Sequence, residues 1–279
     1  MKKISRRSFL AAAGLSVAAL ALTACGGSSA STASSVASSA ASSEAASTSA
    51  AAGELATVEA GKLTMATNAA FPPYEMTTDA GEFEGIDIET AQAIADKLGL
   101  ELQIDDMDFD AALLSVQQGK ADIVMAGVTV TDERKAVMDF SDSYATGIQS
   151  IIVPEGSDIA SPDDLAGKKI GTQRGTTGYI YCSDDFGDEN VVAYDDGLTA
   201  VQALNNGQVD AVVIDNAPAQ EFIAANPGLK ILDTSYAEED YAIGMAKGSA
   251  LEDAVNKALE ELKADGTLQA IVDKYINAN

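Results

Sequence analysis

The nine residues VQQGKADIV at 116–124 recur in altered form as LNNGQVDAV at 204–212, a shift of 88 residues. Each copy combines the end of a predicted helix, a glycine suited to end it, an acidic residue and a hydrophobic strand. Since each strand needs a sheet to lie in, two copies predict two sheets and therefore two lobes. Taken alone, the repeat also fits a common supersecondary unit that recurs without functional meaning.

Short runs typical of strands alternate with helical patterns around this repeat. Strands are predicted at 63–67, 101–104, 121–126 and 209–214. Helices are predicted at 88–98 with Gly99 as C-cap, from Asp110 as N-cap to Gly119, and along an apolar stripe at 251–262. This alternation predicts an α/β fold with mostly parallel sheets. The stripe at 251–262 must pack on a lobe, but the pattern does not say on which one.

The ends of two predicted strands carry candidate binding groups. The repeat places Gly127 and Asp215 at equivalent points, each just past a strand. In open α/β sheets, ligands bind at the edge formed by the carboxyl ends of the strands. If both edges face one cleft, we expect Gly127 and Asp215 to line it.

Opposite charges near these strand ends suit a small zwitterion. Arg134 follows the strand at 121–126, and a guanidinium can hold a carboxylate through two parallel hydrogen bonds. Thr129 adds a hydroxyl beside it, and Asp215 can accept from an ammonium group. The alternatives are an Arg134 that pairs with neighbouring acidic residues and an Asp215 that faces solvent or caps a helix.

A glycine-rich segment and two aromatic residues complete the candidate site. GTQRGTTG at 171–178 runs from a predicted strand into a helix, and with Thr176 and Thr177 it suits a carboxylate at the helix start. It lacks the lysine of a Walker loop and the spacing of a dinucleotide site. Phe71 follows the predicted strand at 63–67, and Phe109 precedes the predicted helix that starts at Asp110. Both can clamp the apolar part of a ligand, although an aromatic residue more often belongs to the core.

Composition excludes several classes of function. The chain has 279 residues with 43 acidic and 17 basic side chains, a formal charge of −26, so we expect no nucleic-acid partner. It has no histidine, which excludes Ser-His-Asp and Cys-His catalysis and histidine-ligated zinc. Cys25 and Cys182 are the only cysteines, and the acidic clusters at 105–110 and 184–189 lack the EF-hand pattern. We therefore predict no metal and no cofactor, and assign Cys182 no role.

The N-terminus has the features of an export signal. Residues 1–24 combine a basic start with an apolar stretch of 14 residues at 9–22, short of the roughly 20 that span a bilayer. LTAC at 22–25 resembles a bacterial lipobox, which predicts lipidation of Cys25. SRRSFL at 5–10 also fits a twin-arginine motif, so the export route stays open. Residues 25–53, the lipidated cysteine and a stretch rich in Ala and Ser, predict a flexible tether.

Seven segments in order resemble one family: FPPYE (71–75), GIDIE (85–89), AGVTVTDER (126–134), FSDSY (140–144), LAGK (165–168), QRGTT (173–177) and GQVDA (207–211). The chain resembles the bacterial extracellular solute-binding proteins of family 3, the polar amino-acid receptors of ABC importers. The resemblance implies a two-lobe type II periplasmic-binding fold with hinges near 146–150 and 239–242. Lobe 1 would comprise 54–147 plus 242–279, and lobe 2 would comprise 148–241.

The resemblance also implies roles for the head-group residues. Arg134, helped by Thr129 and Thr177, would hold the α-carboxylate of the ligand. Asp215, with the Gly127 carbonyl and the Thr129 hydroxyl, would hold the α-ammonium. This agrees with the zwitterion site inferred from the residues themselves.

Four further positions would contact the ligand side chain. Phe71 and Phe109 would sandwich it, with Asn68 and Gln173 near its tip. The position of Asn68 is commonly acidic in receptors for cationic amino acids, so a neutral Asn68 favours an uncharged polar ligand such as glutamine. Glu75 or Asp79 can restore a cation site if their loop folds inward.

We therefore expect an extracytoplasmic, lipid-anchored monomer that captures a free amino acid and delivers it to an ABC permease without chemistry. Its location would be the outer face of the cell membrane or the periplasm. One alternative is a sensor subunit that reports amino acids to a membrane receptor. Another is an enzyme on the same scaffold, similar to cyclohexadienyl dehydratase. The bound amino acid, the permease and any signalling role do not follow from the sequence.

Overall fold

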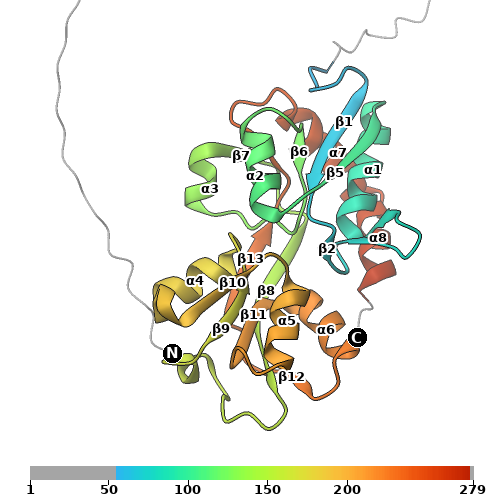
Figure 1. Cartoon of the computed structure of the whole chain (residues 1–279). Helices are drawn as coiled ribbons and strands as arrows, with labels where there is room; N and C mark the ends of the chain where they lie inside the picture. The colour runs from blue at the N-terminus through green and yellow to red at the C-terminus, as the bar shows by residue number, and fades with distance from the viewer. Residues whose placement is uncertain (1–54, 277–279) are drawn as a thin grey trace, which may run out of the picture. The chain divides into compact units, whose positions relative to one another are not determined.

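A computed structural model describes residues 55–276, which form two sheets flanked by helices and one small sheet (Figure 1). The predictions for the signal sequence, Cys25 and the tether lie outside these described residues. The prediction of a mixed α/β fold with two sheet-and-helix lobes is confirmed. The sheets are mixed and not mostly parallel as expected, because four of the nine strand pairs in the two large sheets are parallel and five are antiparallel. Within the described residues, no helix has both the length and the apolar character needed to cross a bilayer.

The first lobe contains a five-stranded sheet in the order β5-β1-β6-β14-β7. Strands β1 and β5 and strands β1 and β6 are parallel, whereas β14 runs antiparallel to β6 and β7. The strands are β1 (Lys62–Thr67), β5 (Glu101–Asp106), β6 (Ile123–Val124), β7 (Met138–Phe140) and β14 (Gly244–Ala246), and the helices are α1 (Ile86–Leu98), α2 (Phe109–Gln117), α3 (Asp132–Val137), α7 (Glu252–Ala264) and α8 (Thr267–Tyr275).

The second lobe contains a sheet in the order β10-β9-β11-β8-β12, with β13 paired to β8. Its strands are β8 (Ala145–Pro154), β9 (Ile170–Gln173), β10 (Val191–Tyr194), β11 (Ala211–Asp215), β12 (Leu229–Ile231) and β13 (Ala237–Tyr241), and its helices are α4 (Thr177–Phe186), α5 (Gly197–Asn205), α6 (Asn216–Ala225) and the 3-10 turns Pro162–Leu165 and Asp188–Asn190. The small sheet joins β2 (Ala70–Phe71), β3 (Glu75–Thr77) and β4 (Phe83–Glu84).

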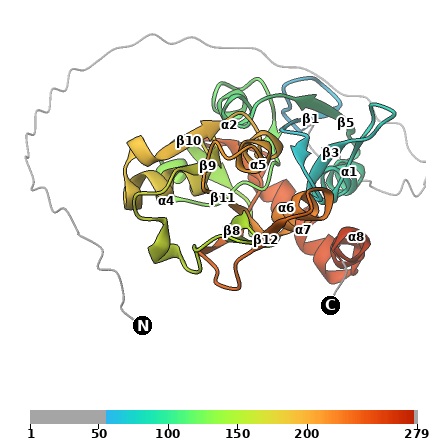
Figure 2. The ribbon, with the colours of Figure 1, turned by 60° about the horizontal axis from the view of Figure 1, so that its bottom comes forward.

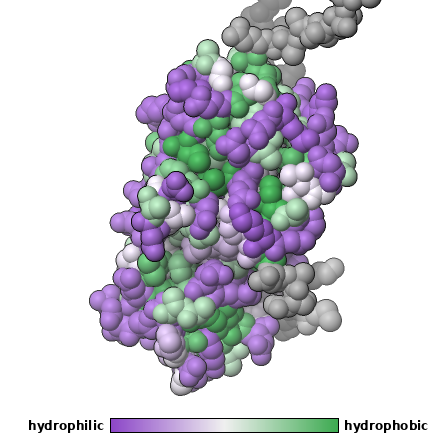
Figure 3. Space-filling view, turned by 90° about the vertical axis from the view of Figure 1, so that its right-hand side faces the viewer, coloured by the Kyte–Doolittle hydropathy of each residue, from purple (hydrophilic) through white to green (hydrophobic). Residues whose placement is uncertain are grey.

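Helices cover both faces of each large sheet, which explains why the central strands are apolar throughout. In the first lobe, Leu63 and Met65 of β1 pack with α1, α7 and α8, while Ala66 packs on the opposite face with α2. In the second lobe, α4 lies on one face and α5 and α6 on the other, as Figures 1 and 2 both show. The apolar stripe at 251–262 thus packs in the first lobe. The face that carries α8 is mostly hydrophilic, with apolar residues in separate patches (Figure 3).

The internal repeat forms the same unit in each lobe. Helix α2 leads to β6, and helix α5 leads to β11. Gly119 (φ 65°) and Gly207 (φ 68°) both adopt the left-handed conformation, and the N–H of each donates at 3.0 Å to the carbonyl three residues earlier. Strand β6 then pairs with β1, and strand β11 pairs with β9, in parallel. The repeat therefore builds the centre of two different sheets.

Three local predictions are wrong in detail. The strand expected at 121–126 has only two residues, because the chain turns at Gly127, which has φ +55°. Helix α2 begins at Phe109 with Asp108 as N-cap, so Asp110 lies in the first turn instead of capping the helix. Asp215 is the last residue of β11, because its pairing with Gln149 of β8 extends the strand to it. The last of these differences arises from a contact between strands far apart in the sequence.

The chain passes between the two lobes along paired strands. Strand β8 pairs with β13 from Ala145 opposite Tyr241 to Gln149 opposite Ala237. Thr129 forms an isolated bridge with Tyr241. These pairings bring residues from both lobes close to β13, beside the edges where the candidate binding groups lie.

The repeat also supplies a stability prediction. Asp122 is buried and accepts hydrogen bonds from the N–H groups of Val58 (2.7 Å) and Thr64 (2.8 Å), whereas its repeat counterpart Asp210 is exposed and accepts one, from Lys169 (2.8 Å). Removing an acceptor from buried donors costs more than removing it from solvated ones. We expect Asp122→Ala to lower the free energy of unfolding by about 2–3 kcal/mol and Asp210→Ala by less than about 1 kcal/mol. Urea unfolding measures both, and equal losses would contradict this account.

Candidate functional site

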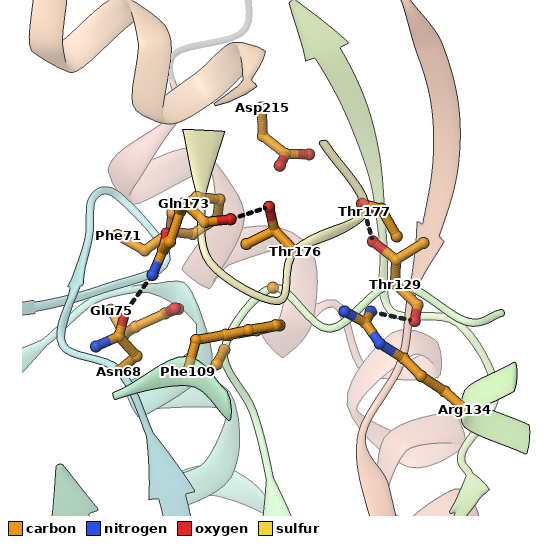
Figure 4. Close-up of a pocket in the computed structure, with 12 residues that line it drawn as sticks. Asn68, Phe71, Glu75, Phe109, Thr129, Arg134, Gln173, Thr176, Thr177 and Asp215 are labelled. Atoms are coloured by element: carbon orange, nitrogen blue, oxygen red, sulfur yellow. Dashed lines mark hydrogen bonds between the residues drawn. The ribbon is translucent and has the colours of Figure 1, made fainter. Parts of the chain in front are cut away.

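Twelve residues from both lobes line one pocket with a cavity volume of about 20 Å³ (Figure 4). A cavity of this size has room for about one water molecule. All ten candidate residues lie in the lining, together with Glu75 and Ala126: Asn68, Phe71, Phe109, Gly127, Thr129, Arg134, Gln173, Thr176, Thr177 and Asp215. The structure thus brings together residues that are up to 147 positions apart in the sequence.

Arg134 supplies the positive charge of the pocket. It lies on α3, whose N-cap Thr131 accepts from the Arg134 N–H at 3.1 Å. Its side chain is 8% exposed, and its guanidinium donates to the carbonyls of Thr129 (2.7 Å) and, across the pocket, Gly175 (3.2 Å). Burial lowers the pKa of Arg134, but a guanidinium remains charged in proteins. Its partners are neutral carbonyls, so its charge is available to an anion.

Asp215 supplies a negative group from the second lobe. One carboxylate oxygen accepts from Gln149 Nε2 at 2.8 Å, and the other accepts from the Tyr241 hydroxyl. Burial raises the pKa of Asp215 to about 7. A cation bound beside it would favour the ionised form and lower that pKa.

Gly127 brings backbone close to the centre of the pocket. A Cβ at this position would lie 2.8 Å from Cε1 of Phe71, and its φ of +55° also favours glycine. The Gly127 N–H donates to Asp87 Oδ2 at 3.0 Å, and the same oxygen accepts from the Tyr144 hydroxyl at 2.8 Å. Asp87, on α1, therefore holds the Gly127 turn in place, a role that no local sequence signal shows.

Glu75 is the one ionisable group of the lining outside the ten candidates. It is fully buried at the start of β3, whereas Asp79 is exposed. Burial, with Asp87 and Asp215 nearby, raises the pKa of Glu75 well above its usual range. The loop thus folds inward at Glu75, which places a carboxyl group in the lining of the pocket.

Amide side chains meet at another end of the pocket. Gln173 Nε2 donates to Asn68 Oδ1 at 2.8 Å, which joins the two lobes, and Asn68 Nδ2 donates to the Met107 carbonyl at 3.0 Å. Phe71 stacks on Tyr74 with ring centroids 5.9 Å apart, and the Arg134 guanidinium lies 5.4 Å from the centroid of Phe109. This end offers neutral hydrogen-bonding groups beside aromatic surface.

The segment at 171–178 runs from β9 into α4, as the sequence predicts. Thr176 is the N-cap of α4 and accepts from the Tyr179 N–H at 3.3 Å, while its hydroxyl donates to the Gln173 carbonyl at 2.8 Å. The Thr177 hydroxyl lies 3.4 Å from the Thr129 hydroxyl of the first lobe. The start of α4 therefore closes one wall of the pocket opposite Arg134.

Other groups of the described chain suit no metal ion. Among residues 55–276, no set of three or more His, Cys, Asp or Glu side chains is arranged to hold one. Cys182 is buried on α4, and burial raises the pKa of its thiol to about 12. The chemistry of the described pocket is thus that of opposite charges, hydroxyls, amides and aromatic rings.

Known proteins resemble this chain along the whole described region. The L-cystine-binding protein TcyJ of Escherichia coli (strain K12) is 33% identical over 226 residues, which covers 79% of this chain and 85% of TcyJ. The arginine-binding extracellular protein ArtP of Bacillus subtilis (strain 168) is 33% identical over 224 residues, 77% of this chain and 86% of ArtP. The crystal structure of an ancestral arginine-binding protein bound to glutamine is 42% identical, with a TM-score of 0.75, and covers 79% of this chain and 100% of that protein.

The fold is therefore that of the type II periplasmic amino-acid-binding proteins. Residues 63–278 match the family described as bacterial extracellular solute-binding proteins, family 3. The relatives above are named as binding proteins. On this match, together with the shared fold and the identity to several curated relatives, the chain belongs to the bacterial extracellular solute-binding proteins of family 3.

Proposed function

We propose that the pocket binds a free polar α-amino acid. The observation that carries this proposal is the pair of buried, oppositely charged groups, Arg134 and Asp215, that line one small pocket. The guanidinium suits the α-carboxylate, together with the start of α4. Asp215 suits the α-ammonium, together with the Gly127 carbonyl and the Thr129 hydroxyl. A molecule with both groups on one carbon fits this arrangement.

We propose glutamine, or a similar uncharged polar amino acid, as the ligand. Asn68 and Gln173 offer amide donors and acceptors to a terminal amide. Phe71 and Phe109 would hold the aliphatic part of the side chain between them. Solved relatives show that one scaffold of this kind accepts different ligands, since ancestral arginine-binding proteins are known bound to glutamine and to arginine.

We further propose that the two lobes close on the ligand. Lobe 1 would comprise 54–147 plus 242–279 and lobe 2 would comprise 148–241, with hinges in β8 near 146–150 and in and after β13 near 239–242. These strands pair with each other and carry the chain between the sheets. A ligand that contacts both lobes binds the closed state better and so shifts the population toward it.

The closed protein would deliver its ligand to an ABC permease. We propose that residues 1–24 are an export signal and that Cys25 carries a lipid, so that the monomeric body is tethered by 25–53 to the outer face of the membrane. The curated relatives support transport, since several are named as binding proteins of ABC transporters. An ABC receptor releases its ligand unchanged, which distinguishes it from an enzyme on the same scaffold.

The first test is a thermal-shift screen of the twenty standard amino acids on the 54–279 body. A ligand at 100 times its Kd stabilises the folded state by about 2.7 kcal/mol. We expect glutamine to raise the melting temperature and to be recovered intact by mass spectrometry. Arg134→Ala and Asp215→Ala should each abolish the shift, since losing one buried charged partner costs about 2–5 kcal/mol of binding.

The matched control for this test is Arg174→Ala. Arg174 is the other arginine of the body, and its side chain is 56% exposed. This variant should keep the full ligand-induced shift. A normal shift in Arg134→Ala or in Asp215→Ala would refute the assignment of the head-group site.

Ligand affinity should depend on pH through Asp215. The pKa of this carboxyl is about 7 without ligand, and a bound ammonium would lower it, so binding below pH 7 must expel a proton. We expect the affinity for glutamine to rise about tenfold from pH 6 to pH 8. Titration calorimetry in two buffers of different ionisation enthalpy would detect the released proton. Equal affinities at pH 6 and pH 8 would contradict this linkage.

Selectivity for the side chain should change when Asn68 becomes acidic. Asn68→Asp puts a carboxylate beside the tip of the ligand. It keeps an acceptor for Gln173 Nε2 but removes the donor to the Met107 carbonyl. We expect this variant to raise the affinity for arginine relative to glutamine by about tenfold, equivalent to about 1.4 kcal/mol. Competition between the two amino acids measures the ratio, and an unchanged ratio would show that the side chain ends elsewhere in the pocket.

A further inference from the structure

Glu239 is a buried carboxylate at the junction of the two lobes. It lies on β13, is 7% exposed and accepts three hydrogen bonds on Oε2. The donors are the hydroxyls of Thr129 and Thr177 and the amide Nε2 of Gln149, each at 3.0 Å. Two of these donors, Thr129 and Thr177, line the candidate pocket. Glu239 itself is not part of the lining, but it contacts two residues that are.

The hydrogen bonds to Glu239 determine what the two hydroxyls can offer a ligand. A threonine hydroxyl has a single hydrogen and two lone pairs, and an ionised carboxylate can only accept. When both hydrogens point to Glu239, both oxygens can present only lone pairs to the pocket. The two hydroxyl oxygens, which lie 3.4 Å apart, then act as acceptors. Acceptors suit an ammonium group and repel a carboxylate.

Glu239 lies among other ionisable groups of the pocket wall. Its negative charge opposes the effect of burial on the pKa of Arg134, and burial together with Glu239 raises the pKa of Tyr181. Gln149 Nε2 lies between Oε2 of Glu239 (3.0 Å) and Oδ2 of Asp215 (2.8 Å). One amide therefore links the two carboxylates, which together make this side of the pocket favourable for a cation.

We propose that Glu239 is a positioning residue for the α-ammonium of the ligand, acting through the hydroxyls of Thr129 and Thr177. This inference rests on the proposed function, because it requires a ligand with an α-ammonium. It assigns the Thr177 hydroxyl to the ammonium, whereas the resemblance implies a role at the carboxylate. It also makes the residues of β8 and β13 part of the recognition of the ligand and not only of the movement of the lobes.

The test compares Glu239→Gln with wild type for two probes, L-glutamine and 4-carbamoylbutanoate, which is glutamine without its ammonium. The amide has nearly the same shape but can donate to the hydroxyls and reverse their direction. We expect the affinity for glutamine to fall about tenfold or more, while that for 4-carbamoylbutanoate stays equal or rises. Titration calorimetry measures both, and circular dichroism checks the fold. Glu238→Gln, an exposed neighbour on β13 with the same change of charge, should bind both probes as wild type does.

The threonine hydroxyls provide the decisive control. In a Thr129→Val/Thr177→Val background, Glu239→Gln should no longer change the ratio of the two affinities, because the groups through which it acts are gone. If Glu239→Gln weakens both probes equally, or still changes the ratio in this background, the proposal is wrong. If the wild-type protein does not bind glutamine, the proposal of glutamine as ligand is wrong independently of the role of Glu239. The same comparison is then made with L-arginine and 5-guanidinopentanoate, which is arginine without its ammonium.

Discussion

The site depends on two buried charges of opposite sign that do not satisfy each other. Among the described residues, neither Arg134 nor Asp215 forms an ion pair within 4.0 Å, and their hydrogen-bond partners are carbonyl, amide and hydroxyl groups. An unpaired buried charge is unfavourable, and both of these groups belong to the lining of one pocket. A zwitterion would supply both missing partners at once, so the same arrangement that costs stability in the free protein provides affinity.

The two lobes supply these charges through one local design used twice. In each lobe a helix, a left-handed glycine and a strand bring the chain to the carboxyl edge of a sheet, at Gly127 in one and at Asp215 in the other. The edges face a common pocket because β8 and β13 pair with each other between the sheets. Since recognition groups come from both edges, a ligand that uses all of them has to be held by both lobes. Affinity and closure are therefore two results of the same contacts.

Protonation sets the charge balance of the pocket. Burial raises the pKa of Asp87 to about 6 and the pKa of Glu75 well above its usual range. Asp87 also holds the Gly127 turn through its hydrogen bond to the Gly127 N–H. The pKa of Asp215 is raised to about 7, so a bound ammonium would favour its ionised form.

The sequence by itself predicted the two-lobe α/β fold and the strand-end, glycine-segment, arginine and aromatic candidates, because these are local features that can be read in order, while Asn68 and Gln173 came from the resemblance to the family. Tertiary structure alone decided the inward position of Glu75 and the roles of Asp87, Gln149 and Glu239. Those depend on hydrogen bonds between residues far apart, such as Thr129 with Glu239, 110 positions away, and Asn68 with Gln173, 105 positions away. Local patterns carry no information on such partners, since the direction of a buried hydrogen bond is set by whatever the folded chain brings beside it.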